Sequence, residues 1–546
     1  MNTLQIRILL VGLLFAMGLS HRYVAAAVPT LPASANADRL AVGQRIYREG
    51  ITSSGAPLRA ATAGQTQLSG KEVACVACHR RSGYGSTEGQ TTVRPITAGA
   101  LFEDKTLVVR SPRIKAQLGS RQRPAYSAQT LARAIRQGLD SSDKPLESLM
   151  PRFVLTDDDM ASLILYLNTL SLDPSPGVDD QEIHFATVVD SNVAPQRRRA
   201  MLEVMQAFFK DKGANVRQEE LRRDAGNMRM YRAYRKWVLH VWELQGSAES
   251  WPAQLEAYYR DQPVFALVGG LGLADWAPVH AFSERFEVPA VFAQMGLPVT
   301  QGENNYNLYL TRGVALQVDV LASFLKSQGE TQRVIQVYRA DATGLAASAR
   351  LREALASHAK IEDVVLAGVP DANFWSKLIA AQADGVVLWL TGQELVNLPP
   401  DGLPVPTYLA FDFLGEKLPT DLTKRNENVR LVYPSDLSPK HESRLLRNKI
   451  WLRSKGIAIT DEVVQMNTLF AMTVVSDALG HLMDSFSRDY FVERIEHAVA
   501  QMPTPSFYPG VSLGQGQRFA AKGASVVRLV GGEKPQFKGL SEWIVP

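Results

Sequence analysis

Cys75-Val76-Ala77-Cys78-His79 is the stretch that decides how the first part of this chain folds. It has the form Cys-x-x-Cys-His, the pattern that ties a c-type haem to a polypeptide. The two thiols would add across the haem vinyl groups and His79 would give an imidazole to the iron, which requires all three groups on one tight turn. An incidental Cys-x-x-Cys beside a histidine is the alternative. The chain has no other cysteine, which excludes a disulfide-stapled scaffold and a zinc site of four thiolates.

The first 27 residues (1–27) have the pattern of a secretory signal peptide. Arg7 gives a positive start, residues 8–19 are apolar and uncharged, and Ala25-Ala26-Ala27 offers small residues for cleavage. The apolar run is short for a membrane span, no second run is long enough, and no cysteine follows it that could anchor a lipoprotein. Because bacteria attach haem covalently outside the cytoplasm, signal and motif together predict a soluble periplasmic protein without stable membrane insertion.

The charge of the chain argues against binding to nucleic acid. The formal net charge is +4, and cleavage of the signal peptide would remove Arg7 and Arg22 from it. The remaining charge is too small to create a strong field for a polyanion. A length of 546 residues predicts three or four structural lobes, at roughly 150 residues for each.

Residues 36–171 form the first predicted domain, a small all-α unit around the haem motif. It is expected to open with an amphipathic helix in which Gly43 leaves room for another helix to approach closely. Ser127 begins a second helix, which Gly138 ends. Thr156 caps a third helix, whose first turn holds three aspartates that suit the positive end of the helix dipole.

These features resemble class I cytochrome c. The resemblance rests on Gly43 and Tyr47 in the first helix, the Cys75–His79 motif, TLARAIRQGLD (130–140) and LMPRFVLTDDDMASLILYL (149–167). It covers roughly a quarter of the chain and implies one covalently bound haem c. A Gly/Ser/Thr-rich insert at 52–70 departs from the family pattern, and we expect a surface loop there.

The second ligand of the haem iron can be sought among few residues. His79 is the only histidine of the mature segment before residue 172, which excludes ligation by two histidines within this domain. Met150 and Met160 remain, and plain helix packing is the other interpretation of Met160. Met150 precedes Pro151, in extended backbone that can lay a thioether across the haem, and the family resemblance also places its Met–Pro ligand there. We therefore predict His/Met ligation, which favours electron transfer over oxygen chemistry.

Tyr84 and Arg94 are candidate contacts of the haem edge or its propionates. Both follow the haem motif within the same domain. Ordinary loop residues are the alternative interpretation of the pair.

A Pro/Gly/Asp-rich linker at 172–182 leads to a region of different pattern. Over 183–546, apolar runs of strand length alternate with helical stretches, which predicts doubly wound parallel sheets in two α/β lobes. Trp237, His240 and Trp242 are interpreted as packing residues at mixed helical spacing. The expected strands are 183–189, 264–268, 290–292, 334–338, 364–366, 385–390 and 407–411, and the expected helices include 197–212, 314–326 and 345–357.

This region resembles the type I periplasmic solute-binding proteins, such as the branched-chain amino-acid receptors. The resemblance rests on IHFATVVD (183–190), ALVGGLG (266–272), VPAVFAQ (288–294), NLYLTRG (307–313), RVIQVYRADATG (333–344) and ADGVVLWLTG (383–392). It implies a small-molecule ligand in a cleft between the lobes. The loop at 269–274 lacks the hydroxyl that holds a carboxylate in the amino-acid receptors, which argues against an ordinary amino acid. The cleft candidates, each with a surface or capping role as its alternative, are Asp190, Trp276, Gln294, Asp341, Thr391 and Asp412.

The sequence favours a periplasmic monohaem electron carrier fused to a module that binds a solute, senses it or docks a partner. Its expected redox partners are a donor dehydrogenase or cytochrome and an acceptor oxidase or reductase. A solute receptor of a transporter with an accessory haem is one alternative, and the electron-accepting subunit of a periplasmic dehydrogenase is another. No nucleophile elbow, phosphate loop or complete dinucleotide motif is present in the large region, so catalysis is not predicted.

Overall fold

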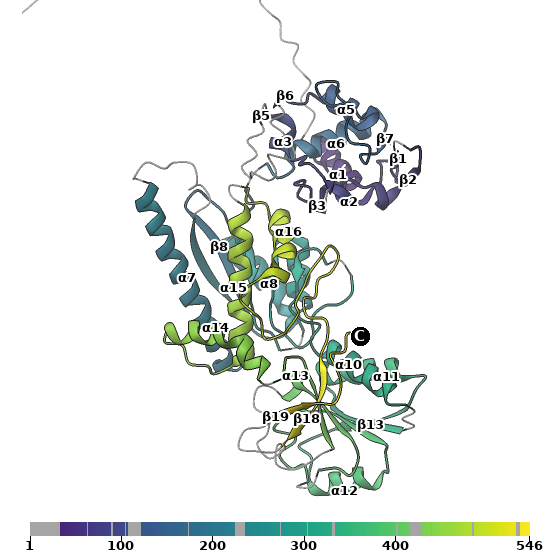
Figure 1. Ribbon diagram of the computed structural model, residues 1–546, viewed down its shortest axis with the longest axis vertical. Coiled ribbons are helices and arrows are strands. Elements are labelled where there is room, and N and C mark those ends of the chain that lie inside the picture. The colour runs from purple at the N-terminus through teal and green to yellow at the C-terminus, as the bar shows by residue number, and fades with distance from the viewer. Residues whose placement is uncertain are drawn as a thin grey trace, which may run out of the picture.

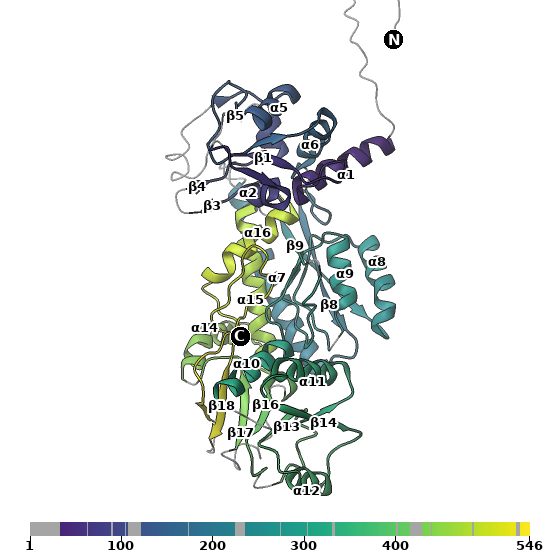
Figure 2. The same ribbon diagram turned by 90° about the vertical axis from the view of Figure 1, so that its right-hand side faces the viewer.

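The computed structural model describes residues 33–546 apart from 63, 89–90, 104, 107–121, 173, 224–234, 274, 303, 330–332, 400–401, 415–427, 438, 483–484 and 531–535. The predicted signal peptide at 1–27 lies outside the described residues. Three bodies follow one another along the molecule: the segment with the haem motif, a first α/β lobe and a second α/β lobe (Figure 1, Figure 2). Within the described ranges, no helix combines the length and apolar character needed to cross a membrane.

Helices build most of the core of the haem-motif segment, but the expected all-α unit also contains a small antiparallel sheet. The helices are α1 (Ala33–Glu49), α2 (Cys75–His79), α3 (Ala98–Phe102), α5 (Ala128–Gln137), α6 (Asp157–Thr169) and the 3-10 turn η1 (Gly70–Val73). α1 crosses α6 so closely that a Cβ on Gly43 would lie 2.1 Å from the carbonyl oxygen of Ser162. The expected role of Gly43 is therefore confirmed.

The predicted helix ends are also confirmed. The Ser127 side chain forms a capping box with Thr130 at the start of α5, and Gly138 ends this helix with a left-handed φ of 73°. The Thr156 side chain accepts a hydrogen bond from the backbone N–H of Asp159 at the start of α6. Local sequence signals thus fix the ends of both helices.

The insert at 52–70 differs from the expected surface loop. Its strands β1 (Arg59–Ala61) and β2 (Gln67–Ser69) form an antiparallel sheet with β7 (Arg152–Val154). Leu58 and Ala60 are buried against the helices. The insert therefore contributes to the core, and its Gly/Ser/Thr-rich composition concealed this. The other short strands of the segment are β3 (Thr87–Glu88), β4 (Thr91–Thr92), β5 (Lys105–Thr106) and β6 (Gln122–Arg123).

The first lobe is built on a five-stranded parallel sheet in the order β12-β11-β10-β8-β9. Its strands are β8 (Glu182–Asp190), β9 (Lys236–Leu244), β10 (Ala266–Val268), β11 (Ala290–Val291) and β12 (Asn307–Leu308). Its helices are α7 (Pro195–Arg223), α8 (Trp251–Asp261), α9 (Ala277–Arg285), α15 (Glu462–Leu482) and α16 (Arg488–Ala498), with 3-10 turns η2 (Ala248–Ser250) and η4 (Val499–Gln501). Apolar side chains of α7 and α15 cover one face of the sheet, and those of α8 and α9 cover the other.

The second lobe holds a seven-stranded sheet in the order β14-β13-β15-β16-β17-β18-β19. Its strands are β13 (Arg333–Arg339), β14 (Lys360–Leu366), β15 (Gly385–Trp389), β16 (Thr407–Ala410), β17 (Val429–Tyr433), β18 (Ser525–Val530) and β19 (Gln536–Gly539). β18 and β19 are antiparallel, so this sheet is mixed rather than wholly parallel as expected. The remaining helices are α10 (Val314–Ser327), α11 (Ala342–Leu355), α12 (Ala372–Ala380), α13 (Phe411–Leu414) and α14 (Lys440–Ser454).

β9 corrects the interpretation of Trp237, His240 and Trp242 as residues at helical spacing. They belong to a strand, in which neighbouring side chains point to opposite faces. Trp237 packs on the α7 side of the sheet and Trp242 is buried on the α8 side. The His240 ring stacks on that of His184 from the next strand. All three residues pack against neighbouring side chains, but they alternate between the two faces of a strand rather than lining one face of a helix.

Candidate functional site

The haem motif forms the single short helix α2, so its three functional side chains lie on one turn. Cys75 is half-buried, Cys78 is exposed, and both are free thiols. Burial raises the pKa of the Cys75 thiol to about 12, so the haem-free thiol is protonated at neutral pH. Two free thiols and an imidazole on one turn are a donor set that fits a covalently bound haem.

The His79 imidazole is buried, with 8% of its surface exposed. Its Nδ1 lies 3.0 Å from the carbonyl oxygen of Arg94, which can only accept, so Nδ1 carries the proton and donates it. Burial lowers the pKa of His79, against an opposing effect of this hydrogen bond. The imidazole is therefore neutral with an unprotonated Nε2, the form in which histidine binds a metal ion.

Met150 and Met160 occupy different surroundings. Met160 lies in α6 with 3% of its surface exposed, inside the core of the haem-motif segment. Met150 is half-buried in the turn before β7, at the edge of the same core, and its carbonyl accepts a hydrogen bond from the Arg152 guanidinium. A sulfur at the edge of a core is easier to offer to a metal than one enclosed by packing.

Arg94 and Tyr84 make contacts that the sequence did not suggest. Arg94 takes part through its backbone carbonyl, which orients His79, while its own side chain is exposed. The Tyr84 ring stacks on Tyr490 of α16, with ring centroids 4.1 Å apart. The Arg94 carbonyl thus positions His79 within the haem-motif segment. The stacking of Tyr84 on Tyr490 joins this segment to the first lobe.

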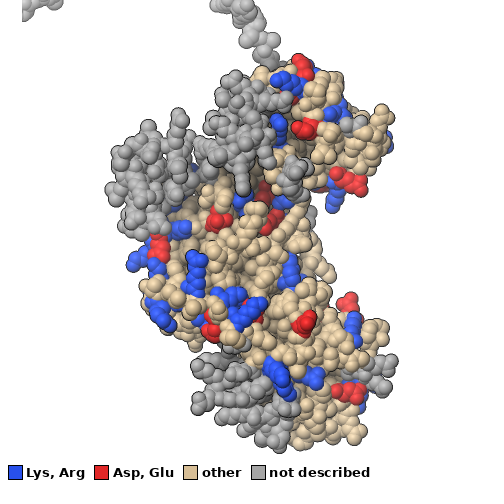
Figure 3. Space-filling view, viewed as in Figure 1, with Lys and Arg blue, Asp and Glu red and all other residues tan. Residues whose placement is uncertain are grey.

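Two arginines that follow His79 are held by acidic residues of α16. The Arg80 guanidinium pairs with Glu496, whose other oxygen lies 2.5 Å from the Arg518 guanidinium. The Arg81 Nε lies 3.3 Å from the Asp489 carboxylate. Figure 2 shows α2 next to α16, and Figure 3 shows acidic and basic side chains meeting at this junction. The loop that leaves the haem motif is thus fastened to the first lobe by ion pairs.

Ser82, a neutral residue of the same loop, also contacts an acidic residue of α16. Its backbone N–H and its hydroxyl donate to the two oxygens of the Glu493 carboxylate, at 3.0 and 2.6 Å. Burial raises the pKa of Glu493 to about 7 and the nearby Asp489 charge adds to this, while the Ser82 hydrogen bonds and Arg80 act against it. The pKa of Glu493 therefore lies near neutral pH.

α1 reaches the same surface from the other side of the haem-motif segment. Its Arg48 guanidinium lies 2.6 Å from Glu287 and 3.4 Å from Asp489. The Tyr306 hydroxyl donates to Asp489 at 2.6 Å. Sequence reasoning missed this junction, although one signal was available: the acids of α16 recur at positions 489, 493 and 496, the i, i+4, i+7 spacing of one helix face.

Three of the six cleft candidates serve their own loops. Asp190 accepts hydrogen bonds from the backbone and side chain of Asn192. Asp341 caps the start of α11, and the hydroxyl and N–H of Thr391 donate to Glu394. These contacts correspond to the capping role that sequence analysis gives as the alternative.

The other three candidates are distributed over both lobes. Trp276 is 2% exposed in the core beside α9. The Gln294 amide donates to α15 within its own lobe, and Asp412 begins α13 in the second lobe. Burial raises the pKa of Asp412 to about 6, opposed by a hydrogen bond from Gln317 and the charge of Arg197. Over the described part of the chain, no hydrogen bond or ion pair joins any two of the six candidates.

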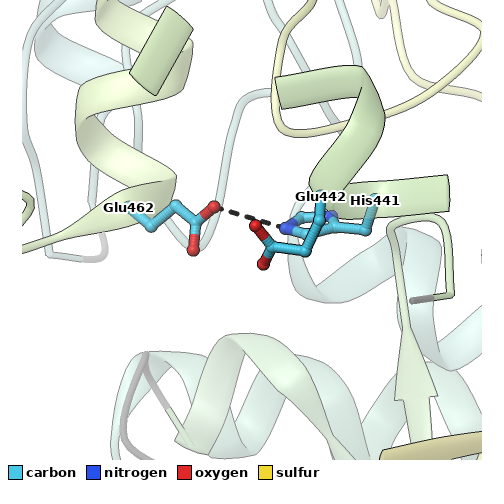
Figure 4. Close-up of side chains that lie close together, drawn as sticks. All are labelled: His441, Glu442 and Glu462. Carbon is cyan, nitrogen blue, oxygen red and sulfur yellow. Dashed lines mark hydrogen bonds and ion pairs between the residues drawn. The ribbon is translucent and has the colours of Figure 1, made fainter. Parts of the chain in front are cut away.

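A separate cluster of His441, Glu442 and Glu462 lies where α14 and α15 meet (Figure 4). The His441 Nε2 is 3.3 Å from Glu462. The Lys449 ammonium lies 2.6 Å from Glu442 and 2.9 Å from Glu462, so a cation of the chain already sits between the two carboxylates. The cluster is an ion-pair joint between two helices.

Comparison with known proteins finds similarity to one group of proteins in the haem-motif segment and to another in the α/β region. Residues 61–171 match the family model for cytochrome c. Among curated proteins, none matches the sequence significantly. A fatty acid ABC transporter substrate-binding protein from Thermomonospora curvata superimposes with a TM-score of 0.50 at 12% identity, over 68% of this chain and 95% of its own.

Two further solved structures have lower similarity. A branched-chain amino acid ABC transporter protein from Thermus thermophilus, crystallised with valine, has a TM-score of 0.47 at 12% identity, over 68% of this chain and 98% of its own. A leucine-binding protein from Thermotoga maritima has a TM-score of 0.46 at 12% identity, over 67% and 99%. At 12% identity, the likeness to the Thermomonospora curvata protein indicates a shared fold and leaves the ligand open. Residues 61–171 therefore form a cytochrome c domain, and most of the remaining chain has the fold of the type I periplasmic binding proteins.

Proposed function

We propose that this protein is a periplasmic one-electron carrier, in which a monohaem cytochrome c is fused to a module that binds a solute or docks a partner. Cys75 and Cys78 hold one haem c through thioethers, and His79 and Met150 bind its iron. The haem supplies one-electron redox chemistry. With His79 and Met150 as ligands of the iron, the haem would transfer electrons and would leave no site for O2.

The observation that carries this proposal is the state of His79. The imidazole sits on the same turn as two free thiols and donates its Nδ1 proton to the Arg94 carbonyl, which leaves Nε2 for a metal. Histidine ligands of metals are oriented in this way by a partner on their other nitrogen. Burial of the ring keeps water away from that nitrogen.

In this proposal, the binding module docks redox partners and regulates electron transfer at the haem. A donor dehydrogenase or cytochrome delivers the electron, and an oxidase or reductase receives it. A small molecule bound between the lobes changes their relative position, and α15 and α16 carry that change to the loop after His79. The contacts of α16 with Arg80, Arg81 and Ser82 support this route. A location outside the cytoplasm fits both the cytochrome c domain and the binding-protein fold.

Expression with the haem maturation machinery, followed by intact-mass analysis, tests the attachment. We expect the mass of the cleaved chain plus one haem, and loss of the haem in the variant Cys75→Ala/Cys78→Ala. The same preparation is then examined for co-purifying small molecules, and the midpoint potential is compared before and after their removal. A chain without bound haem would refute the carrier, and an unchanged potential would refute regulation by that molecule.

The second candidate is a solute receptor of a transporter, with the haem as an accessory. The fold shared with ABC transporter substrate-binding proteins favours it. The two candidates differ in the haem-free variant Cys75→Ala/Cys78→Ala. A receptor of this kind would keep both its ligand and its contribution to uptake by cells, whereas an electron carrier would lose its activity.

A further inference from the structure

We infer that Glu493 of α16 is a proton-binding site linked to the haem. When a one-electron donor protein delivers one electron to the haem, the Glu493 carboxylate takes up one proton from water. It releases that proton when the electron leaves. The inference rests on the haem attachment proposed above and assigns to a residue of the binding-protein region a part in the redox reaction.

The three carboxylates on one face of α16 differ in their partners. Asp489 is paired with Arg48 and Arg81, and Glu496 lies between two other guanidinium groups. Among the described residues, the hydrogen bonds of Glu493 come from Ser82 alone, whose N–H and hydroxyl are neutral donors. A carboxylate between paired neighbours that has no cation of its own is the one that can be neutralised by a proton.

The surroundings of Glu493 hold its two protonation states close in free energy. The titratable and charged groups that interact with it are Tyr47 of α1, Arg80 of the loop after α2, and Asp489 and Tyr490 of α16. Arg81 interacts with Asp489, and Arg494 interacts with Tyr490. Burial and the Asp489 charge raise the pKa of Glu493 to about 7, while Ser82 and Arg80 favour the charged form. The side chain is half-buried, so water reaches it.

The haem motif and Glu493 are joined by a short, fixed path. Ser82 lies in the loop that leaves α2 directly after His79, and its hydroxyl also accepts a hydrogen bond from the N–H of Tyr84 at 3.1 Å. The Tyr47 hydroxyl donates to the Arg80 carbonyl at 2.7 Å and holds the same loop from inside. These hydrogen bonds tie Glu493 to the loop that follows His79.

The sign of the coupling follows from charge. The oxidised haem carries one more positive charge than the reduced haem, and a positive charge favours a nearby carboxylate. Reduction therefore raises the pKa of Glu493. At a pH between the pKa of Glu493 in the oxidised protein and its pKa in the reduced protein, reduction of the haem is accompanied by protonation of Glu493. The midpoint potential must therefore fall as the pH rises through this interval. Outside that interval, Glu493 makes no contribution to the pH dependence.

Spectroelectrochemical titration of the haem-loaded full chain from about pH 5 to about pH 9 tests the inference, because the range spans the titration of a carboxyl group with a raised pKa. We expect a fall of the midpoint potential centred near neutral pH. Glu493→Gln keeps an acceptor oxygen for Ser82 and is expected to lose this fall. Asp158→Asn, which neutralises an exposed carboxylate of α6 paired with Arg39, is the control and is expected to keep it.

Ser82→Ala gives a result in a defined direction. It removes one hydrogen bond to the carboxylate, so the pH interval of the fall must move upward. Redox-induced infrared difference spectra supply a second readout, in which the carbonyl band of a protonated carboxylic acid appears on reduction and is absent in Glu493→Gln.

A wild-type potential that is level around neutral pH, or a fall that survives in Glu493→Gln, would overturn the inference. Intact mass is measured on the same samples to separate this failure from that of the proposed function. Absence of covalent haem refutes the electron carrier, whereas covalent haem with a level potential refutes only the role of Glu493.

Discussion

The Arg94 carbonyl determines which nitrogen of the His79 ring carries the proton. By accepting a hydrogen bond from His79 Nδ1 at 3.0 Å, it selects the tautomer with a free Nε2. A backbone carbonyl supplies this contact, so the identity of residue 94 does not determine it. Sequence reasoning could not foresee this backbone contact, and the predicted contact of Arg94 with the haem edge or its propionates stays a prediction.

The axial ligand is tested by two methionine substitutions. Met150→Ala is expected to remove the visible-spectrum features of His/Met ligation and to lower the midpoint potential, because the thioether favours the reduced iron. Met160→Ala is expected to keep both and to lower the free energy of unfolding by about 2–5 kcal/mol, because it leaves a cavity in the core. Reduced-minus-oxidised spectra and urea unfolding measure the two effects. The reverse spectral result would contradict the assignment of Met150.

Asp412 is expected to give the second lobe a pH-dependent stability. Burial raises the pKa of Asp412 to about 6, above its value in the unfolded chain, so its favourable contribution is present at low pH and is lost as the pH rises towards 6. Asp412→Asn should therefore increase the free energy of unfolding at neutral pH by about 1–2 kcal/mol, after allowance for partial exposure. Urea unfolding of both proteins below pH 4 and at neutral pH measures this. An equal difference at the two pH values would contradict the cause.

At the scale of elements, the crossing of α1 and α6 depends on one missing side chain. Gly43→Ala would place a Cβ 2.1 Å from the Ser162 carbonyl oxygen, so the helices must move apart. We expect the free energy of unfolding to fall by about 1–3 kcal/mol. The control is Gly480→Ala, at an exposed position of α15 with open space around it, which should stabilise the protein by about 0.5–1 kcal/mol. Thermal or urea unfolding that ranks the two variants in the opposite order would contradict this packing.

Elements with strong local signals could be predicted, and elements defined by distant contacts could not. The starts of α5 and α6 could be predicted from the capping residues Ser127 and Thr156, because capping depends on residues within one turn. β9 was missed because its burial has no clean alternation, and its aromatic residues fit a helical spacing almost as well. The strands in the insert 52–70 were missed because their partner, β7, lies far along the chain.

At the scale of the whole molecule, the sequence indicated a haem segment and a larger α/β region, and the spacing of the α16 acids was the one available signal of a contact between them. The haem motif and both family resemblances depend on short contiguous motifs, which can be recognised in the sequence itself. The junction depends on Arg80 and Glu496, which are separated by 416 positions in the chain. The cleft candidates were taken from loop positions alone, and Trp276 lies in the core because loop position does not determine the direction of a side chain.

The junction between the two units is expected to be a large part of the stability of the haem segment. Glu496→Ala leaves two largely buried guanidinium groups, of Arg80 and Arg518, without a carboxylate. Loss of one partner of a buried ion pair costs about 3–5 kcal/mol. Asp158→Ala removes an exposed pair with Arg39 and should change the free energy of unfolding by less than about 1 kcal/mol. Equal effects of the two substitutions, measured by urea unfolding, would show that the junction is not buried in solution.

Potentiometric titration of the full haem-loaded chain, followed by its visible absorbance, tests the proposed electron carrier most directly. One haem with two side-chain ligands predicts a single Nernst curve with the slope of a one-electron transfer. Carbon monoxide added to the reduced protein should leave its visible spectrum unchanged, because His79 and Met150 would leave the iron without an open position. An absorbance that does not respond to potential, or a curve that needs two components, would contradict it.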